Sequence, residues 1–372
     1  MLHLKRMRNI KLILSCVIVG VIVALIYYGF ETGVAHSIDF VWNTLLQSEA
    51  HRWIVIPITL FGALIFFAAQ HYLDPKSEQH ETKGLGGNIT KPTFKKLFLV
   101  LFIGYFSLLA GASLGPEAIL VPACMTAGGL LGLKLLKQDS AVKILSAAAL
   151  IALMASFFHS FWVGLLSILL VKKEANVKIT APLVAIAVAA SASAAYTLSF
   201  IAPKESYFKL PKMTWEIALI DIIACAVLLF VGFLATFGLK YSHNFILKLR
   251  KKAKLKTWWQ QALLASLGLS AIYLVGGPLV QFTGNNSVLP MLHQASALGI
   301  LGLGGVVLMK ILAIGWSKAM GYRGGLIFPM AFVAAALTAL VQFLFHDLSF
   351  GIGFVAIMVG IFIAESKAKI LL

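Results

Sequence analysis

Two short segments of this sequence hold glycine and proline between long apolar runs. The first is Gly111-Ala-Ser-Leu-Gly-Pro-Glu117, and the second is Gly321-Tyr-Arg-Gly-Gly-Leu-Ile-Phe-Pro329. Each places a proline near the start of an apolar run, which is a typical signal for a helix N-terminus. A helix that begins within a membrane exposes backbone N–H groups that lipid cannot satisfy, and its positive dipole end attracts anions. The pair of segments therefore predicts a binding site for a small anion.

Glu117 is the carboxylate that belongs to the first segment. In a helix that starts at Gly115 or Pro116 it lies in the first turn, and helical side chains tilt back toward the N-terminus. The carboxylate could therefore occupy the anion site and leave it when protonated, which makes Glu117 a candidate gate. The simpler alternative is that it only offsets the helix dipole, which is worth about 0.3–1 kcal/mol. First-turn acids are common in any helix, and this favours the simpler alternative.

Other polar side chains within the apolar runs also allow two interpretations. Ser113 could donate its hydroxyl to an anion or could cap a helix. Arg323 could draw anions into a vestibule or could extend to the lipid headgroups. Lys310 would be costly at mid-depth unless it faced a cavity, so a position near a membrane surface is expected.

Asp221 and His159 are two further ionisable candidates. Asp221 could serve a proton path, although an interfacial cap or a partner for lysine is the favoured interpretation. His159 could titrate near neutral pH, but a lone histidine at a helix break is more often a hydrogen-bonded structural residue.

The composition of the chain indicates a membrane protein. Of the 372 residues, 60% are hydrophobic and only 12% are charged, whereas soluble domains carry about a quarter charged residues. The net charge of +17 comes largely from basic clusters beside apolar runs, such as 5–8 and 248–256. Such clusters are typical of cytoplasmic loops that face anionic lipid, and we do not expect a nucleic-acid partner. Cys16, Cys124 and Cys225 lie far apart in apolar runs, which predicts core residues and no metal site.

The apolar runs predict a polytopic, all-helical protein with a single transmembrane domain over residues 1–372. We expect a long polar loop at 74–96, a basic loop at 240–256, and approximate halves 1–205 and 212–372. Several of the expected helices are shorter than the about 20 residues that span a bilayer, and broken or re-entrant helices of this kind mark transporters and channels. The expected helices are 10–30, 53–72, 98–110, 116–136, 141–155, 162–171, 179–201, 217–239, 258–275, 298–316, 327–345 and 352–364.

The two segments resemble motifs of the CLC family of chloride channels and transporters. Residues 112–116 stand where that family has Gly-Lys/Arg-Glu-Gly-Pro, and 324–329 where it has Gly-Gly-Ile-Phe-Ala-Pro. The wider pattern is similar to a divergent bacterial branch of ion-transport proteins, and the similarity runs from about residue 95. The resemblance implies two halves of inverted topology, a homodimer with one pore per subunit, and a multi-pass location in a bacterial cell membrane. It also implies an anion site, with chloride as the first candidate, formed by Ser113, Leu114, Gly115, Gly324, Gly325, Leu326, Ile327 and Phe328.

The sequence departs from the family pattern at several functional positions. The family's gating glutamate falls on Leu114, its inner proton-transfer acid near Leu170 or Val171, and its serine loop has no clear match between 74 and 96. The family's tyrosine on a last helix is expected beyond Leu372, so a C-terminal helix could be missing. These departures favour passive, channel-like conduction over proton-coupled exchange.

Three functional alternatives therefore stay open, and none is enzymatic. The first is a channel-like anion pathway, and the second is an anion/proton antiporter in which Glu117 supplies the acid. The third is a non-conducting membrane protein that interacts with other proteins and has lost its gate residues. No metal pair, nucleotide loop or nucleophile motif is found, so we expect no cofactor, no metal and no catalytic residue. The expected partners are chloride or another small anion, membrane lipid and a second copy of the chain.

Overall fold

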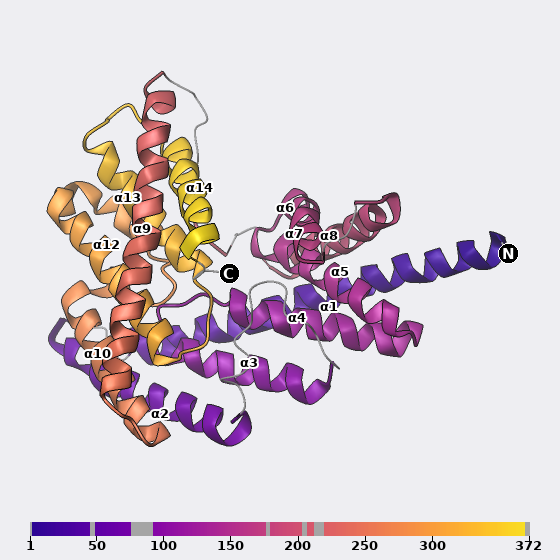
Figure 1. The fold of residues 1–372 in the computed structure, drawn as a ribbon, viewed down its shortest axis with the longest axis horizontal. Coiled ribbons are helices and arrows are strands. Elements are labelled where there is room, and N and C mark those ends of the chain that lie inside the picture. The colour runs from indigo at the N-terminus through magenta and orange to yellow at the C-terminus, as the bar shows by residue number, and fades with distance from the viewer. Residues whose placement is uncertain are drawn as a thin grey trace. The chain divides into compact units, whose positions relative to one another are not determined.

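The structure of this protein is a computed structural model (Figure 1). It describes residues 2–44, 49–75, 92–175, 179–202, 207–211 and 219–368. Within these ranges the regular secondary structure is helical, and extended backbone pairing is limited to one isolated bridge between Gly115 and Gly325. Among the described residues, six helical segments are long and apolar enough to span a membrane. Most of the predicted loop 74–96 lies outside the described residues.

The chain divides into two compact units, of which the first comprises 1–36, 76–105 and 118–208. In this unit α5 packs against α8, and α6 packs against both. The predicted interruption at 157–161 is confirmed, because α5 ends at Phe157 and α6 begins at Phe161. The helices with most of their residues in this unit are α1 (Leu2–Ile38), α3 (Phe94–Leu109), α4 (Glu117–Leu131), α5 (Asp139–Phe157), α6 (Phe161–Leu166), α7 (Ile168–Ala175) and α8 (Ala181–Ile201).

His159 lies at this interruption with a left-handed backbone, at φ 46°. Its ring is 6.5 Å from the ring of Tyr27 in an edge-on arrangement. Ser160 is the N-cap of the next helix, and its hydroxyl oxygen accepts a hydrogen bond from the Val163 amide at 3.4 Å.

The second unit comprises 37–75, 106–117 and 209–372, so it contains both predicted segments. In this unit α9 packs along α14 and also contacts α12, while α10 packs against α2 (Figure 1). Helix α13 lies in the core of this unit, because the nine successive residues from 328 to 336 are all buried. The helices of this unit are α2 (Val55–Leu73), α9 (Leu219–Lys252), α10 (Trp258–Gly276), α11 (Val288–His293), α12 (Ala295–Met320), α13 (Ile327–Gln342) and α14 (Phe350–Ala368).

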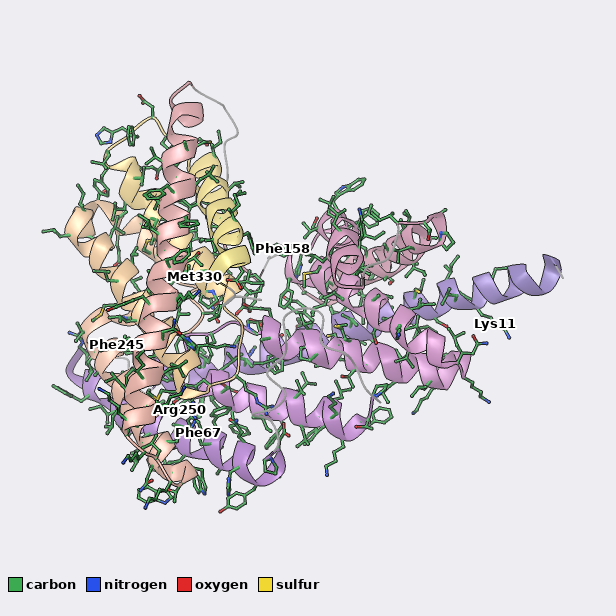
Figure 2. All side chains as sticks on the ribbon, viewed as in Figure 1. Lys11, Phe67, Phe158, Phe245, Arg250 and Met330 are labelled. Atoms are coloured by element: carbon green, nitrogen blue, oxygen red, sulfur yellow. The ribbon has the colours of Figure 1, made fainter. Side chains whose placement is uncertain are left out.

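The basic loop predicted at 240–256 is wrong over most of its length. Helix α9 continues through it to Lys252, and its last turn contains Arg250, Lys251 and Lys252. Lysine and arginine are good helix formers, and cations near a helix C-terminus interact favourably with the dipole. Arg250, labelled on α9 in Figure 2, donates to the carbonyl of Ala319 at 3.0 Å. The Asp221 side chain, at the other end of α9, lies outside the described residues.

Glycines let α9 and α14 approach closely. A Cβ atom added to Gly232 on α9 would lie 2.1 Å from the carbonyl oxygen of Ile357, and one added to Gly360 on α14 would lie 2.1 Å from that of Leu229. Both neighbours are backbone atoms, which cannot move aside as a flexible side chain could. Small residues at such positions allow membrane helices to pack backbone against backbone.

We expect Gly232→Leu to destabilise the protein by about 1–3 kcal/mol, because the added side chain must separate two packed helices. Gly238→Leu is the matched control, since Gly238 lies on the same helix with no atom within 4 Å of an added Cβ. Thermal unfolding of the detergent-solubilised variants measures the difference. Equal loss of stability in both variants would contradict this account of the α9–α14 contact.

Candidate anion site

The two predicted segments meet through backbone hydrogen bonds within the second unit. The amide of Gly115 donates to the carbonyl of Gly325 at 2.8 Å, and the amide of Gly325 donates to the carbonyl of Gly115 at 2.7 Å. Residues 210 positions apart in the sequence are therefore joined as a reciprocal pair. The two amides of this pair are occupied by protein carbonyls.

Each glycine of the pair is required by what lies beside it. An added Cβ on Gly115 would lie 1.9 Å from Oε2 of Glu117, and one on Gly325 would lie 2.1 Å from Cδ of the same side chain. The neighbouring Gly324 has a similar constraint, because its added Cβ would lie 2.4 Å from the Cβ of Leu114. The carboxylate of Glu117 therefore fills a space that exists only because both paired residues lack a side chain.

The Glu117 carboxylate binds the N-terminus of α13. Its Oε1 atom accepts hydrogen bonds from the amides of Ile327 at 2.7 Å and Phe328 at 3.2 Å. Helix α13 begins after Leu326, whose carbonyl accepts the first helical bond, from Met330. The amides of Ile327 and Phe328 are thus among the donors that the helix itself leaves unpaired. A carboxyl oxygen therefore lies at the helix end where the sequence predicted an anion.

The second oxygen of this carboxylate has different surroundings. Glu117 is 6% exposed, and its Oε2 atom is buried without a hydrogen-bond partner. An unbonded carboxylate oxygen in a buried site is a position where a proton can be held.

A loop between α10 and α11 supports the first segment. Ser113 donates its hydroxyl to the carbonyl of Phe282 at 2.9 Å, and its amide donates to Oγ of Ser317 at 3.0 Å. Thr283 donates its hydroxyl to the carbonyl of Leu114 at 2.7 Å. The Ser113 hydroxyl hydrogen, which we expected to contact an anion or to cap a helix, is thus directed to a protein carbonyl.

Ser107 supports the second segment in the same way. Its hydroxyl donates to the carbonyl of Arg323 at 2.7 Å and accepts from the amide of Arg323 at 2.8 Å. The guanidinium of Arg323 forms an ion pair with Asp74 at 2.8 Å, and both side chains are about one-quarter exposed. Arg323, for which a vestibule or the lipid headgroups were expected, thus has an acidic residue of the same unit as its partner.

Lys310, for which a position near a membrane surface was expected, is enclosed by the protein itself. Lys310 is fully buried, and its ammonium donates to three backbone carbonyls of the loop 280–282. A buried amine is tolerated when every hydrogen has an acceptor, because the acceptors replace its water shell.

The contacts of the loop 277–284 could not be predicted from the sequence. The glycines and proline around it indicated only a turn, and nothing in its composition indicates which helix it contacts. Tyr273 is part of the same arrangement: its hydroxyl donates to the carbonyl of Gly111 and accepts from the amide of Phe282 at 3.2 Å. A single lysine in an otherwise apolar run was the signal that could have directed attention here.

Three solved structures with a similar fold are described as two antiporters and a transporter. A slow cyanobacterial Cl⁻/H⁺ antiporter aligns with a TM-score of 0.73 at 19% identity, covering 96% of this chain and 87% of that one. A CLC-type fluoride/proton antiporter aligns with a TM-score of 0.67 at 17% identity, covering 95% and 89%. A eukaryotic CLC transporter aligns with a TM-score of 0.70 at 14% identity, covering 97% and 66%. These alignments confirm the predicted CLC-like fold.

Curated relatives carry the name "Putative ion-transport protein YfeO". Those of Salmonella newport (strain SL254) and Salmonella agona (strain SL483) are each 25% identical to this chain over 356 residues. The alignment covers 91% of this chain and 82% of the relative. Together with the six candidate spans, these relatives confirm the prediction of a bacterial multi-pass membrane protein.

The profile of one protein family also matches most of the sequence. The match covers residues 75–371, so it includes both glycine-rich segments and the whole of the second unit from α9 onward. This confirms the resemblance that the two motifs indicated. The chain belongs to the voltage gated chloride channel family.

Proposed function

We propose that this protein conducts small inorganic anions, with chloride as the first candidate, through a channel-like pathway gated by Glu117. Membership of the family supports anion transport across a membrane. In the proposal, the amides of Ile327 and Phe328 bind the anion when Glu117 has left them. A second copy of the chain completes a homodimer, with one pathway in each subunit.

One observation carries this proposal: the Glu117 carboxylate accepts the amides of Ile327 and Phe328 at the α13 N-terminus. An oxygen with negative charge has the same electrostatic requirement as a bound halide, so the carboxylate and an anion compete for the same donors. Hydrogen bonds from amides to a charged group are worth about 1.5–3 kcal/mol. That range is enough for a carboxylate to exclude an anion while it stays charged and in place.

The choice of a channel-like pathway rests on the residues at other family positions. Leu114, at the position of the family's gating acid, is fully buried and its side chain cannot carry a proton. Leu170 or Val171 stands at the inner proton-transfer position and is equally unable to do so. In the proposal, protonation of Glu117 opens the pathway, and neither of these two family positions supplies an acid that could pass the proton on.

Proton-coupled exchange is the second candidate function. The observation that favours it is the unbonded Oε2 atom of Glu117, which could take up a proton as the carboxylate leaves α13. The descriptions of two similar structures name Cl⁻/H⁺ and fluoride/proton antiporters. In this alternative, each proton carried by Glu117 is exchanged for anions that pass the vacated amides.

Purified protein in liposomes distinguishes these alternatives. We expect efflux of chloride, measured with a chloride electrode, without movement of protons in the opposite direction, measured with a pH electrode in the same sample. A fixed ratio of protons to chloride would instead establish exchange. Absence of efflux for chloride, fluoride and nitrate would refute anion transport and leave the non-conducting alternative.

Replacing Glu117 with glutamine tests its role as the gate. Protonation neutralises the carboxylate and weakens its hold on α13, so wild-type flux should rise as the pH falls. In Glu117→Gln the charge is absent at every pH, and flux at neutral pH should be about tenfold higher and independent of pH. Glu365→Gln is the matched control, because Glu365 is a buried carboxylate on α14, outside both segments. Unchanged flux with the wild-type pH response in Glu117→Gln would show that Glu117 only offsets the helix dipole.

A double-mutant cycle tests whether the carboxylate occupies the space between the paired glycines. Gly325→Ala should cost about 1–3 kcal/mol of stability, because its Cβ overlaps Glu117. In a Glu117→Ala background the same substitution should cost at least about 1 kcal/mol less, since the overlapping atoms are gone. Gly305→Ala, whose added Cβ meets no atom within 4 Å, controls for the glycine-to-alanine change itself. Additive effects of the two substitutions in thermal unfolding would place Glu117 elsewhere.

A further inference from the structure

The most unusual group outside the anion site is the buried ammonium of Lys310 on α12. Its Nζ atom lies 3.0 Å from the carbonyl oxygen of Val280 and 3.3 Å from that of Gln281, and it also donates to the carbonyl of Phe282. Three donors thus meet three acceptors, and a fourth contact is the ring of Phe332, 5.0 Å away. In the part of the chain that the structure describes, no carboxylate forms an ion pair with this lysine.

The carbonyl of Phe282 is shared between Lys310 and the first segment. Besides the ammonium, it accepts the hydroxyl of Ser113 at 2.9 Å. The following residue, Thr283, holds the carbonyl of Leu114. The loop that surrounds the ammonium is therefore the loop that supports residues 113–115.

The backbone of this loop requires something to hold it. Phe282 has φ 53°, a left-handed conformation that is unfavourable for a non-glycine residue and persists only when its surroundings fix it. Three consecutive carbonyls that point at one centre also repel one another unless a cation lies between them. The Nζ atom of Lys310 occupies the centre toward which they point.

Backbone carbonyls that converge on one point are the usual ligands of monovalent cations such as potassium. We propose that the carbonyls of 280–282 form a monovalent cation site whose permanent occupant is the tethered ammonium of Lys310. Through this site Lys310 acts as a positioning residue, because it fixes the loop that holds Ser113 and Leu114. Removal of the side chain should leave a vacant site for a free cation of the ammonium or potassium class.

The first test measures stability and needs no transport. In N-methylglucamine chloride, whose cation is too large for the site, Lys310→Ala should lose roughly 6–12 °C in Tm relative to wild type. Potassium or ammonium chloride should restore part of this loss, with a Tm that rises with the logarithm of cation concentration. Wild type should show the same Tm in all three salts. Extraction of Lys310→Ala from membranes in each salt reports the same rescue if the variant is too unstable to purify without the cation.

Two further variants separate the cation from the bulk of the side chain. Lys310→Met fills the volume without charge, so it should lose stability and respond to no cation. Lys240→Ala is the control, since Lys240 is a half-buried lysine of the same unit that lies 5.9 Å from the ring of Phe237. A Lys310→Met protein as stable as wild type would overturn the proposal. So would a Lys310→Ala protein with the same Tm in all three salts.

The second test measures transport, and only this part rests on the proposed function. Chloride efflux from liposomes should fall at least about tenfold in Lys310→Ala without a rescuing cation, because residues 113–115 lose their support, and potassium should restore it. Efflux that is unchanged in Lys310→Ala would refute the positioning role even if the cation site exists. If wild type itself carries no anion, the proposed function fails, while the stability measurements still decide the cation site.

Discussion

The reciprocal hydrogen bonds between Gly115 and Gly325 are the constraint on which the rest of the site depends. They hold two helix beginnings from distant parts of the sequence side by side, in a region without any other extended backbone pairing among the described residues. Because both partners are glycines, the pair leaves a space above its backbone that a single carboxylate fills. The Glu117 side chain, the start of α13 and the close approach of Gly324 to Leu114 all lie beside this pairing.

Supporting contacts surround this pair in a consistent pattern: side-chain hydroxyls bind backbone carbonyls. Ser107 binds Arg323, Ser113 binds Phe282, Thr283 binds Leu114 and Tyr273 binds Gly111. Irregular backbone inside an apolar protein needs such partners, because no lipid group can satisfy its carbonyls. These hydroxyl groups are therefore committed to the protein's own backbone, while the amides at the start of α13 bind the Glu117 carboxylate.

Much of this arrangement could be predicted from the sequence, and the part that could not has a physical reason. The breaks at 111–117 and 321–329, the helix start at Ile327 and the first-turn position of Glu117 all follow from local signals of glycine, proline and apolar runs. The ion pair of Arg323 with Asp74 and the carbonyl contacts of Lys310 depend on where distant loops lie, and periodicity carries no information about that. The prediction of a loop at 240–256 is wrong for another reason: lysine and arginine extend a helix readily, so a basic stretch does not have to be a loop.

Pro329 limits the number of backbone donors at the N-terminus of α13. It occupies the third position of the helix, where an ordinary residue would present another unpaired N–H group, and proline has none. The amides of Ile327 and Phe328 converge on a single oxygen atom. These two amides are accordingly placed to bind one negatively charged atom at a time. A ligand atom could therefore bind these amides only after the Glu117 carboxylate has left them, so the carboxylate and a ligand would exclude each other.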